Sequence, residues 1–261
     1  MRSWVVIALA AAVCAAGCGE GVLKNGGGVL KTQYEYEEEL YLALDGSATL
    51  NVSASVPALV ALRGVDLNVS PRARFDRDRV RAFFQGPGTI VRAISSSRRY
   101  GRRFVHVSID VADVRTLQRL APFAWSSYRL DRDGDVYDFR QAVGPPAAKP
   151  VGNVGWDGSE LVAFRFHIPS KIPFHNAPSR RTERGNILRW EQPLADRLHG
   201  TSIDTTSGDG IIHVQLEAQS ILARTLLLFG STIVAACLTF VAVIWWVARR
   251  GRDTEVTGSG T

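Results

Sequence analysis

Cysteine is nearly absent from this chain of 261 residues. Cys14, Cys18 and Cys237 are the three present, and residues 19–236 contain none. A domain formed by that interval has no internal disulfide available, so packing and hydrogen bonding must hold it together even if it is exported. The sequence therefore predicts a domain with a substantial core rather than a small disulfide-linked scaffold.

Lysine is also scarce, with four residues against 27 arginines, and the formal net charge is +6. Arginine favours planar contacts with carboxylates, phosphates and aromatic rings. These arginines are interspersed with aspartate and glutamate, which is typical of a solvated surface. Because the ends of the chain predict export of the domain, nucleic acid is not an expected partner.

Long uncharged apolar runs are missing from the middle of the chain and occur at its two ends. Residues 1–18 contain one positive charge, a short apolar stretch and a small-residue ending, which together predict a signal peptide. The ending "AAGC", Ala15 to Cys18, resembles the lipobox of bacterial lipoproteins, with Ala where Leu is commoner. The resemblance implies cleavage before Cys18 and acylation of its thiol; an ordinary signal peptide ending in Gly-Cys is the alternative.

The second apolar run, residues 225–247, has no charged residue. As a helix it would span about 34 Å, enough to cross a bilayer core of about 30 Å. Tryptophans and a basic cluster lie at its far end: Trp245, Trp246, Arg249, Arg250 and Arg252. By the positive-inside rule, the tail 248–261 would be cytoplasmic and everything before residue 225 extracytoplasmic. The alternative is a buried core helix.

Between these ends, the sequence predicts a Gly-rich tether at 19–33 and one α+β domain at 34–220. Antiparallel β-hairpins with two or three short helices are expected. The expected strands are 34–44, 48–56, 89–94, 104–111, 128–130, 136–139, 161–168 and 211–219, and the expected helices are 57–62, 75–84 and a short one after Asp113. The Pro/Gly-rich segment 142–155 is either a subdomain break or a long loop.

The segment 167–200 lacks clear periodicity and combines prolines, histidines and arginines with an aromatic residue. Long irregular loops are often functional. The candidate binding residues in it are His167, His175, Arg180, Arg181, Arg184, Trp190 and Glu191. As a binding loop it would present Arg and Trp to phosphate head groups or to a protein. A proline-rigidified connection packed on the sheet is the plainer interpretation.

No metal, cofactor or catalytic residue is assigned from the sequence. His167, His175 and His199 are spaced by 8 and 24 residues, which matches no familiar ligand pattern. No serine nearby lies in a G-x-S-x-G motif. The stretch "DRDGD", residues 131–135, imitates the start of a calcium loop, but Ala142 stands where the loop needs a glutamate. It therefore predicts a hairpin turn.

The overall layout is a lipobox cysteine, a domain that opens with a hairpin turned by "DGS", and a membrane helix with a basic flank. This layout resembles the LppM-type envelope lipoproteins of actinobacteria. The resemblance implies a non-enzymatic envelope protein with an α+β domain, and it carries over no functional residue.

We expect a lipoprotein of the cytoplasmic (inner) membrane with its domain outside, acting as a binding or scaffolding module at the cell envelope. An envelope-acting enzyme using the loop 167–199 is the alternative. The expected partners are the membrane itself and anionic lipid, a cell-wall polymer or an envelope protein.

Overall fold

The computed structural model describes residues 33–178, 186–219 and 221–255. The predicted signal peptide with Cys18, the tether up to residue 32 and the last six residues of the tail lie outside these ranges. The strands are β1 (Tyr34–Leu42), β2 (Ala48–Ser55), β3 (Thr89–Arg99), β4 (Arg102–Val111), β5 (Ser126–Asp133), β6 (Val136–Val143), β7 (Leu161–His167), β8 (Phe174–His175), β9 (Ile187–Pro193) and β10 (Ile211–Glu217). The helices are α1 (Val56–Arg63), α2 (Arg77–Phe84), the 3₁₀ helix η1 (Val114–Arg119), α3 (Leu194–Leu198) and α4 (Ile221–Glu255).

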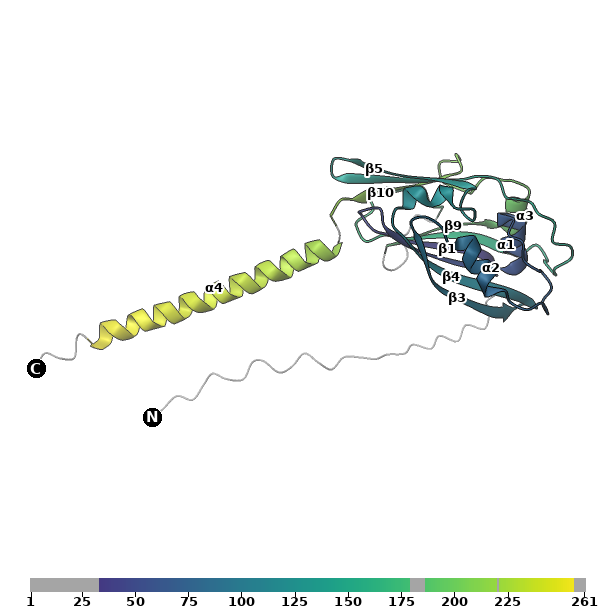
Figure 1. The fold of residues 1–261 in the computed structure, drawn as a ribbon. Coiled ribbons are helices and arrows are strands. Elements are labelled where there is room, and N and C mark those ends of the chain that lie inside the picture. Colours follow the sequence, from purple (N-terminus) through teal and green to yellow (C-terminus); the bar gives the residue numbers. More distant parts are fainter. Residues whose placement is uncertain (1–32, 179–185, 220, 256–261) are drawn as a thin grey trace, which may run out of the picture. The chain divides into compact units, whose positions relative to one another are not determined.

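The strands form two sheets (Figure 1). The large sheet has the order β3-β4-β2-β1-β7-β9, and the small sheet has the order β5-β6-β10-β8. All pairings are antiparallel except β1 with β7, which are parallel. The predicted α+β class with antiparallel hairpins is therefore confirmed. The parallel pair joins the start of the domain to its second half.

The first hairpin forms where the period-two pattern predicts it. Leu40 and Leu42 of β1 and Leu50 and Val52 of β2 are buried, whereas the residues between them face outward. The turn is fixed by Asp45, whose carboxylate accepts hydrogen bonds from the Ser47 backbone N–H and hydroxyl, at 2.9 and 2.7 Å.

Strand β3 extends beyond its predicted end at residue 94. It continues to Arg99 and pairs with β4 along its whole length, and Tyr100 and Gly101 make the turn at φ of 50° and 71°. Two consecutive residues at positive φ are the signature of the tight hairpin turn that matches strand twist. The stretch "SSSRRYGRR" is thus mostly strand, and the sequence interpretation underestimated it.

Helix α1 begins and ends at specific caps. The Ser55 hydroxyl accepts a hydrogen bond from the Ala58 N–H, Pro57 lies in the first turn, and Gly64 ends the helix at φ 71°. All of its residues are buried, and it contacts β1, β2 and β4. The predicted helices at 57–62 and 75–84 are both present, the second as α2.

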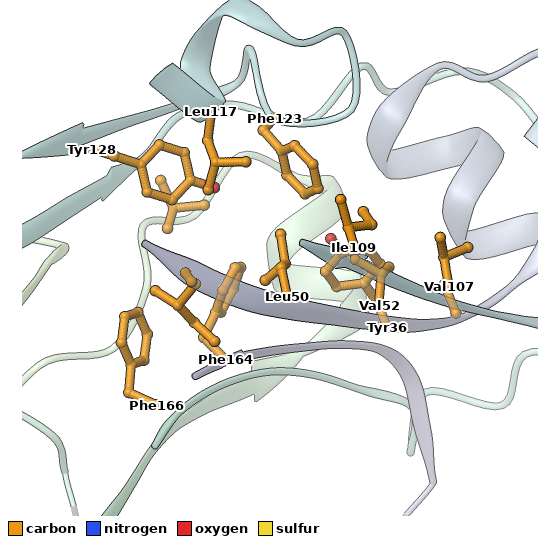
Figure 2. Close-up of a cluster of buried hydrophobic side chains, with 14 of the residues drawn as sticks. Tyr36, Leu50, Val52, Val107, Ile109, Leu117, Phe123, Tyr128, Phe164 and Phe166 are labelled. Atoms are coloured by element: carbon orange, nitrogen blue, oxygen red, sulfur yellow. The ribbon is translucent and has the colours of Figure 1, made fainter. Parts of the chain in front are cut away.

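The core lies between the two sheets and under the helices (Figure 2). Phe164 and Phe166 of β7 face the small sheet, whose contributions include Tyr128 and Phe139. Phe123 closes the side near η1. Each large apolar side chain buried this completely contributes about 1.5–3 kcal/mol to folding.

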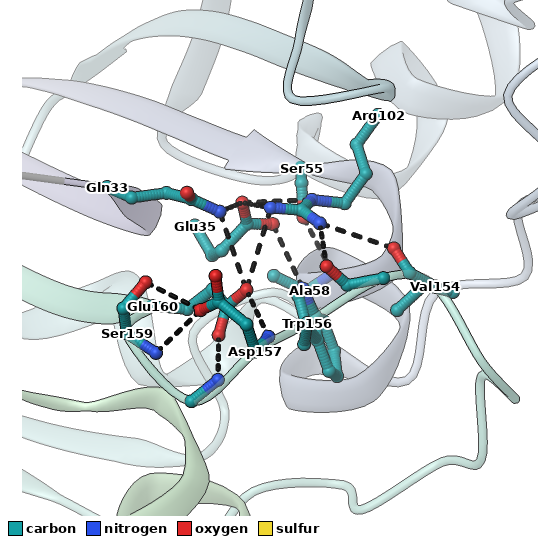
Figure 3. Close-up of polar contacts among 12 residues, drawn as sticks. Gln33, Glu35, Ser55, Ala58, Arg102, Val154, Trp156, Asp157, Ser159 and Glu160 are labelled. Carbon is teal, nitrogen blue, oxygen red and sulfur yellow. Dashed lines mark hydrogen bonds and ion pairs between the residues drawn. The ribbon is translucent and has the colours of Figure 1, made fainter. Parts of the chain in front are cut away.

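The Pro/Gly-rich segment is attached to the large sheet by a buried ion network (Figure 3). The Arg102 guanidinium contacts Glu35 at 2.9 Å and lies 3.7 Å from Glu160. It also donates to the Gly155 carbonyl at 2.8 Å, and Trp156 donates to Glu35 at 3.2 Å. Segments on both sides of residues 142–155 pair within each sheet, β1 with β7 and β6 with β10.

Helix α4 contains a span, Thr225–Trp246, that is long and apolar enough to cross a membrane. None of this span is buried among the described residues, whereas a core helix would be mostly buried. Strand β10 ends at Glu217 and α4 begins at Ile221, so the small sheet leads directly into this helix.

Candidate functional site on the outer face of the large sheet

The predicted binding residues do not lie in one loop. Most of the described part of segment 167–200 is regular structure: β8, β9 and α3. His167 ends β7 and Glu191 lies in β9, and both side chains are on the outer face of the large sheet. Arg180, Arg181 and Arg184 lie outside the described residues, so their role stays a prediction.

Trp190 requires a correction. It lies on the inner face of β9, is 0% exposed and packs edge-on against Phe166 with ring centroids 5.3 Å apart. Leu188 and Gln192 share that inner face. An indole enclosed this completely contributes to the core, so it is not a surface contact for a partner.

His175 lies apart from His167, on the short strand β8 of the small sheet opposite Val214. Its Nδ1 accepts a hydrogen bond from the Ala177 N–H at 3.3 Å, and partial burial lowers the pKa of its imidazole. The two histidines therefore do not form a joint site.

His167 belongs to a charged cluster on β1 and β7. Arg165 Nη1 lies 2.8 Å from Glu37 Oε1 and 3.6 Å from Glu39 Oε1, and His167 Nε2 lies 3.6 Å from the same Glu39 oxygen. Burial raises the pKa of Glu37, against the opposing effect of Arg165. The His167 ring stacks on Tyr41 at 3.9 Å.

Glu191 extends this cluster onto the edge strand. Arg165 and Arg189 are directly opposite each other across β7 and β9, a like-charge pair that needs compensation. Glu191 supplies part of it: its Oε1 lies 3.3 Å from Arg189 Nε and accepts a hydrogen bond from the Tyr34 hydroxyl. The charges of this half of the face largely neutralise one another.

Beside the charged cluster the face is hollowed by a trough of about 290 Å³ that crosses β1, β2, β4 and β3. Register places its lining in two rows. One row is Glu39, Asn51, Ser108 and Ala93, and the other is Glu37, Ser53, His106 and Ser95. The trough exists because the side chains on the three strands beyond β1 are mostly short.

His106 is the central ring of the trough. Ser53 Oγ lies 2.9 Å from its Nδ1 and Ser97 Oγ lies 2.8 Å from its Nε2. Burial, reinforced by the positive charge of Arg99, lowers the pKa of His106, which favours the neutral ring at neutral pH. A neutral imidazole between two hydroxyls both donates and accepts hydrogen bonds.

This geometry differs from that of a serine hydrolase. In a catalytic triad, one ring nitrogen faces the nucleophile and a carboxylate orients the other. Here the hydroxyls of Ser53 and Ser97 form hydrogen bonds with the two ring nitrogens of His106. Among the described residues, no group of three or more His, Cys, Asp or Glu side chains could hold a metal ion. The arrangement is suited to hydrogen-bonded binding.

Sequence reasoning missed the trough because its residues come from four separate strands. The available signal was the outward set of β2, Thr49, Asn51 and Ser53, which is uniformly small and polar. That signal marks an exposed strand face, but it does not reveal that similar rows on β3 and β4 lie beside it.

Comparisons with known proteins give a weak structural likeness. No protein-family model matches the chain, and no curated protein matches it. Among solved structures, the NMR structure of the folded domain of LppM from Mycobacterium tuberculosis matches 76% of this chain and 99% of that domain, at 10% identity and a TM-score of 0.39. This is a weak structural resemblance, and no residue of the site is assigned from it.

Proposed function

We propose that this protein is a membrane-anchored lipoprotein whose extracytoplasmic domain binds a neutral, polyhydroxylated envelope polymer in the trough of the large sheet. The observation that carries the proposal is the composition of that trough, which offers hydroxyl, amide and carboxylate groups side by side. Each of these groups hydrogen-bonds to sugar hydroxyls, and carboxylates accept two such bonds.

The charges in the trough favour a neutral ligand over an anionic one. Glu37 and Glu39 line one side of it. Arg165 is close to both but already pairs with them, at 2.8 and 3.6 Å. A phosphate or a carboxylate polymer would meet these two acidic side chains, and Arg99, the other cation beside the trough, already acts on Glu37 as well as on His106. A neutral glycan is therefore the better complement.

Anchoring supports a role at the cell envelope. The apolar span of α4 provides one attachment, and Cys18, if acylated, provides a second. A spanning helix anchors almost irreversibly, whereas the lipid alone anchors more weakly. With the basic cluster after residue 248 in the cytoplasm, the domain would face the envelope outside the cytoplasmic membrane.

The proposal is tested by binding of neutral oligosaccharides to the full chain in lipid nanodiscs, measured by saturation-transfer NMR. The panel would contain linear oligomers of glucose, galactose, mannose, arabinose and N-acetylglucosamine, with an alginate oligomer as the acidic comparison. The test variant is Asn51→Leu with Ser108→Leu, which fills the trough with apolar atoms. Ser127→Leu, exposed on β5 of the small sheet, is the matched control.

We expect a neutral oligomer to bind wild type and the control alike, and the double variant about tenfold more weakly, since buried polar sugar groups would lose their partners. Binding should change little between about 0.05 and 0.5 M NaCl, because the ligand carries no charge to be screened. Binding of the acidic oligomer alone, or equal binding by wild type and the double variant, would overturn the proposal.

A further inference from the structure

A second hollow lies at the end of the large sheet, outside the trough. This end groove has a volume of about 530 Å³ and is lined by residues 41–45 at the end of β1 and residues 167–169 at the end of β7. Apart from Asp45 and His167, its side chains are apolar or aromatic. Leu42 and Ile168 are buried in its floor, while Pro169 is exposed at its rim.

The walls of the end groove are held in place by hydrogen bonds. On one side, Ala43 N–H donates to the Ser47 carbonyl at 2.8 Å, which fixes the β1–β2 turn. On the other, Ile168 N–H donates to the Asn186 carbonyl at 3.2 Å, and the Asn186 amide donates to the Ser170 carbonyl at 2.8 Å. The groove is therefore formed before any ligand arrives.

Chain connectivity keeps this end of the domain close to the start of α4. Lys171 follows the groove by two residues, and its carbonyl accepts a hydrogen bond from the Glu217 N–H at 3.0 Å. Its ammonium group also lies 3.1 Å from Glu217 Oε1. Glu217 ends β10 and α4 begins at Ile221. Even as fully extended chain, the four residues from Glu217 to Ile221 span at most about 14 Å.

The start of α4 is in turn close to the lipid. The apolar span begins at Thr225, one helical turn after Ile221, and one turn rises about 5.4 Å. The polar interfacial layer on each side of a bilayer core is about 5–8 Å thick. With α4 crossing the bilayer, this short connection lets the groove reach the head groups of the adjacent leaflet, whatever the direction of the helix.

We infer that the end groove takes one acyl chain of a phospholipid from the adjacent leaflet. The apolar lining matches a hydrocarbon chain, and the anchoring helix holds the groove where phospholipid is the ligand at highest local concentration. A soluble peptide or small molecule is not concentrated at the groove by the membrane anchor. The inference depends on α4 spanning the bilayer and is independent of the glycan proposal, because the groove and the trough share no lining residue.

The experiment uses the full chain in phosphatidylcholine nanodiscs that contain a phosphatidylcholine with a diazirine in the middle of one acyl chain. After photolysis, lipid adducts are located by peptide mass spectrometry. The variants are Leu44→Asp and Pro169→Asp, which place a charge inside the groove and at its rim. Ile90→Asp, at an exposed apolar position on β3, is the matched control. Adducts on α4 peptides provide an internal reference.

We expect adducts on peptides containing residues 41–45 or 167–169 in wild type and the control. Both Asp variants should lower these adducts about tenfold, since a charge is costly to bury beside hydrocarbon, with α4 adducts unchanged. Pro169 is exposed, so Pro169→Asp keeps the test valid if Leu44→Asp fails to fold. Wild type labelled on α4 but not at the groove, or variants labelled there as strongly as wild type, would overturn the inference.

Discussion

Replacing Arg102 by methionine tests whether the buried ion network holds the large sheet to the segment before β7. The side chains of Arg102, Glu35 and Glu160 are 4%, 0% and 2% exposed, so water cannot compensate the two carboxylates once the guanidinium is lost. The hydrogen bond to the Gly155 carbonyl is lost as well. Methionine preserves most of the volume, which leaves the uncompensated charge as the main change.

Breaking a buried ion pair from one side costs about 3–5 kcal/mol. For a domain of this size, each kcal/mol lowers the thermal midpoint by about 2–4 °C, so Arg102→Met should lower it by about 6–20 °C. The assay is thermal unfolding of the full chain in nanodiscs, followed by intrinsic tryptophan fluorescence. Trp156, which donates to Glu35, should report the change directly.

Arg115→Met is the matched control, because it removes an arginine from an ion pair of similar length at the surface. Arg115 Nη2 lies 2.8 Å from Asp113, and the two side chains are 55% and 31% exposed. Solvent screens an exposed pair of this kind, so the midpoint should fall far less than it does for Arg102→Met. Adding Glu35→Gln to Arg102→Met should recover part of the loss, since one buried charge is then removed. Equal midpoints for the Arg102 and Arg115 variants would refute the reasoning.

Two further predictions concern acid sensitivity and processing. Because burial lowers the pKa of both His106 and His175 in the folded chain, the unfolded chain binds more protons below its ordinary histidine pKa of about 6.5, and stability should fall as the pH drops through that value. His106→Gln should reduce this fall, measured as the difference between thermal midpoints at about pH 7.5 and 5.5; an unchanged difference would contradict the role given to His106. In a bacterial host that processes lipoproteins, Cys18→Ala should abolish signal cleavage and acylation, which intact-mass spectrometry detects directly. A variant with the same processed mass as wild type, corrected for the substitution, would show that Cys18 is not lipidated.

The strands that could be predicted are those whose two faces differ sharply in polarity. In β2 and β10, buried aliphatic residues alternate with mostly polar ones, and β7 shows the same alternation from Phe164 to His167; each strand was located from that pattern. Helix α1 was identified by its apolar run and its proline. In these elements, the pattern of apolar and polar residues along the chain matches which residues the folded domain buries and which it exposes.

Strand β9 was missed because its inward set mixes Leu188, Trp190 and Gln192, while its outward set includes Ile187 and ends at Pro193. Polarity then no longer separates the faces, and only pairing with β7 determines which residues face inward. The same limit explains the misplaced Trp190. The buried position of Arg102 could not be predicted for a related reason. The stretch "SRRYGRR" contains several arginines, and Arg102 differs from the others by its register opposite Arg99, next to the β3–β4 turn, where it contacts Glu35.

The large excess of arginine over lysine is explained in part by the interior of the domain. Arg63, Arg102 and Arg197 are all buried. Arg63 pairs with Glu38 at 2.8 Å and lies 3.2 Å from the centre of the Trp125 ring, and Arg197 lies 5.0 Å from the same ring. Burial and the neighbouring Arg63 lower the pKa of Arg197 to about 10, so it remains charged at neutral pH.

A lysine could not replace these residues, because its ammonium group lacks the planar, multiple-donor geometry that allows a guanidinium to bind a carboxylate and stack on a ring at once. Arginine is therefore required here to bury a cation, and its abundance does not by itself indicate a polyanionic ligand. The surface to which we assign binding is instead the trough between β1 and β3, where Glu37 and Glu39 are acidic and the serines, Asn51 and His106 are uncharged or nearly so. On our proposal, the placement of these charges favours a neutral ligand there.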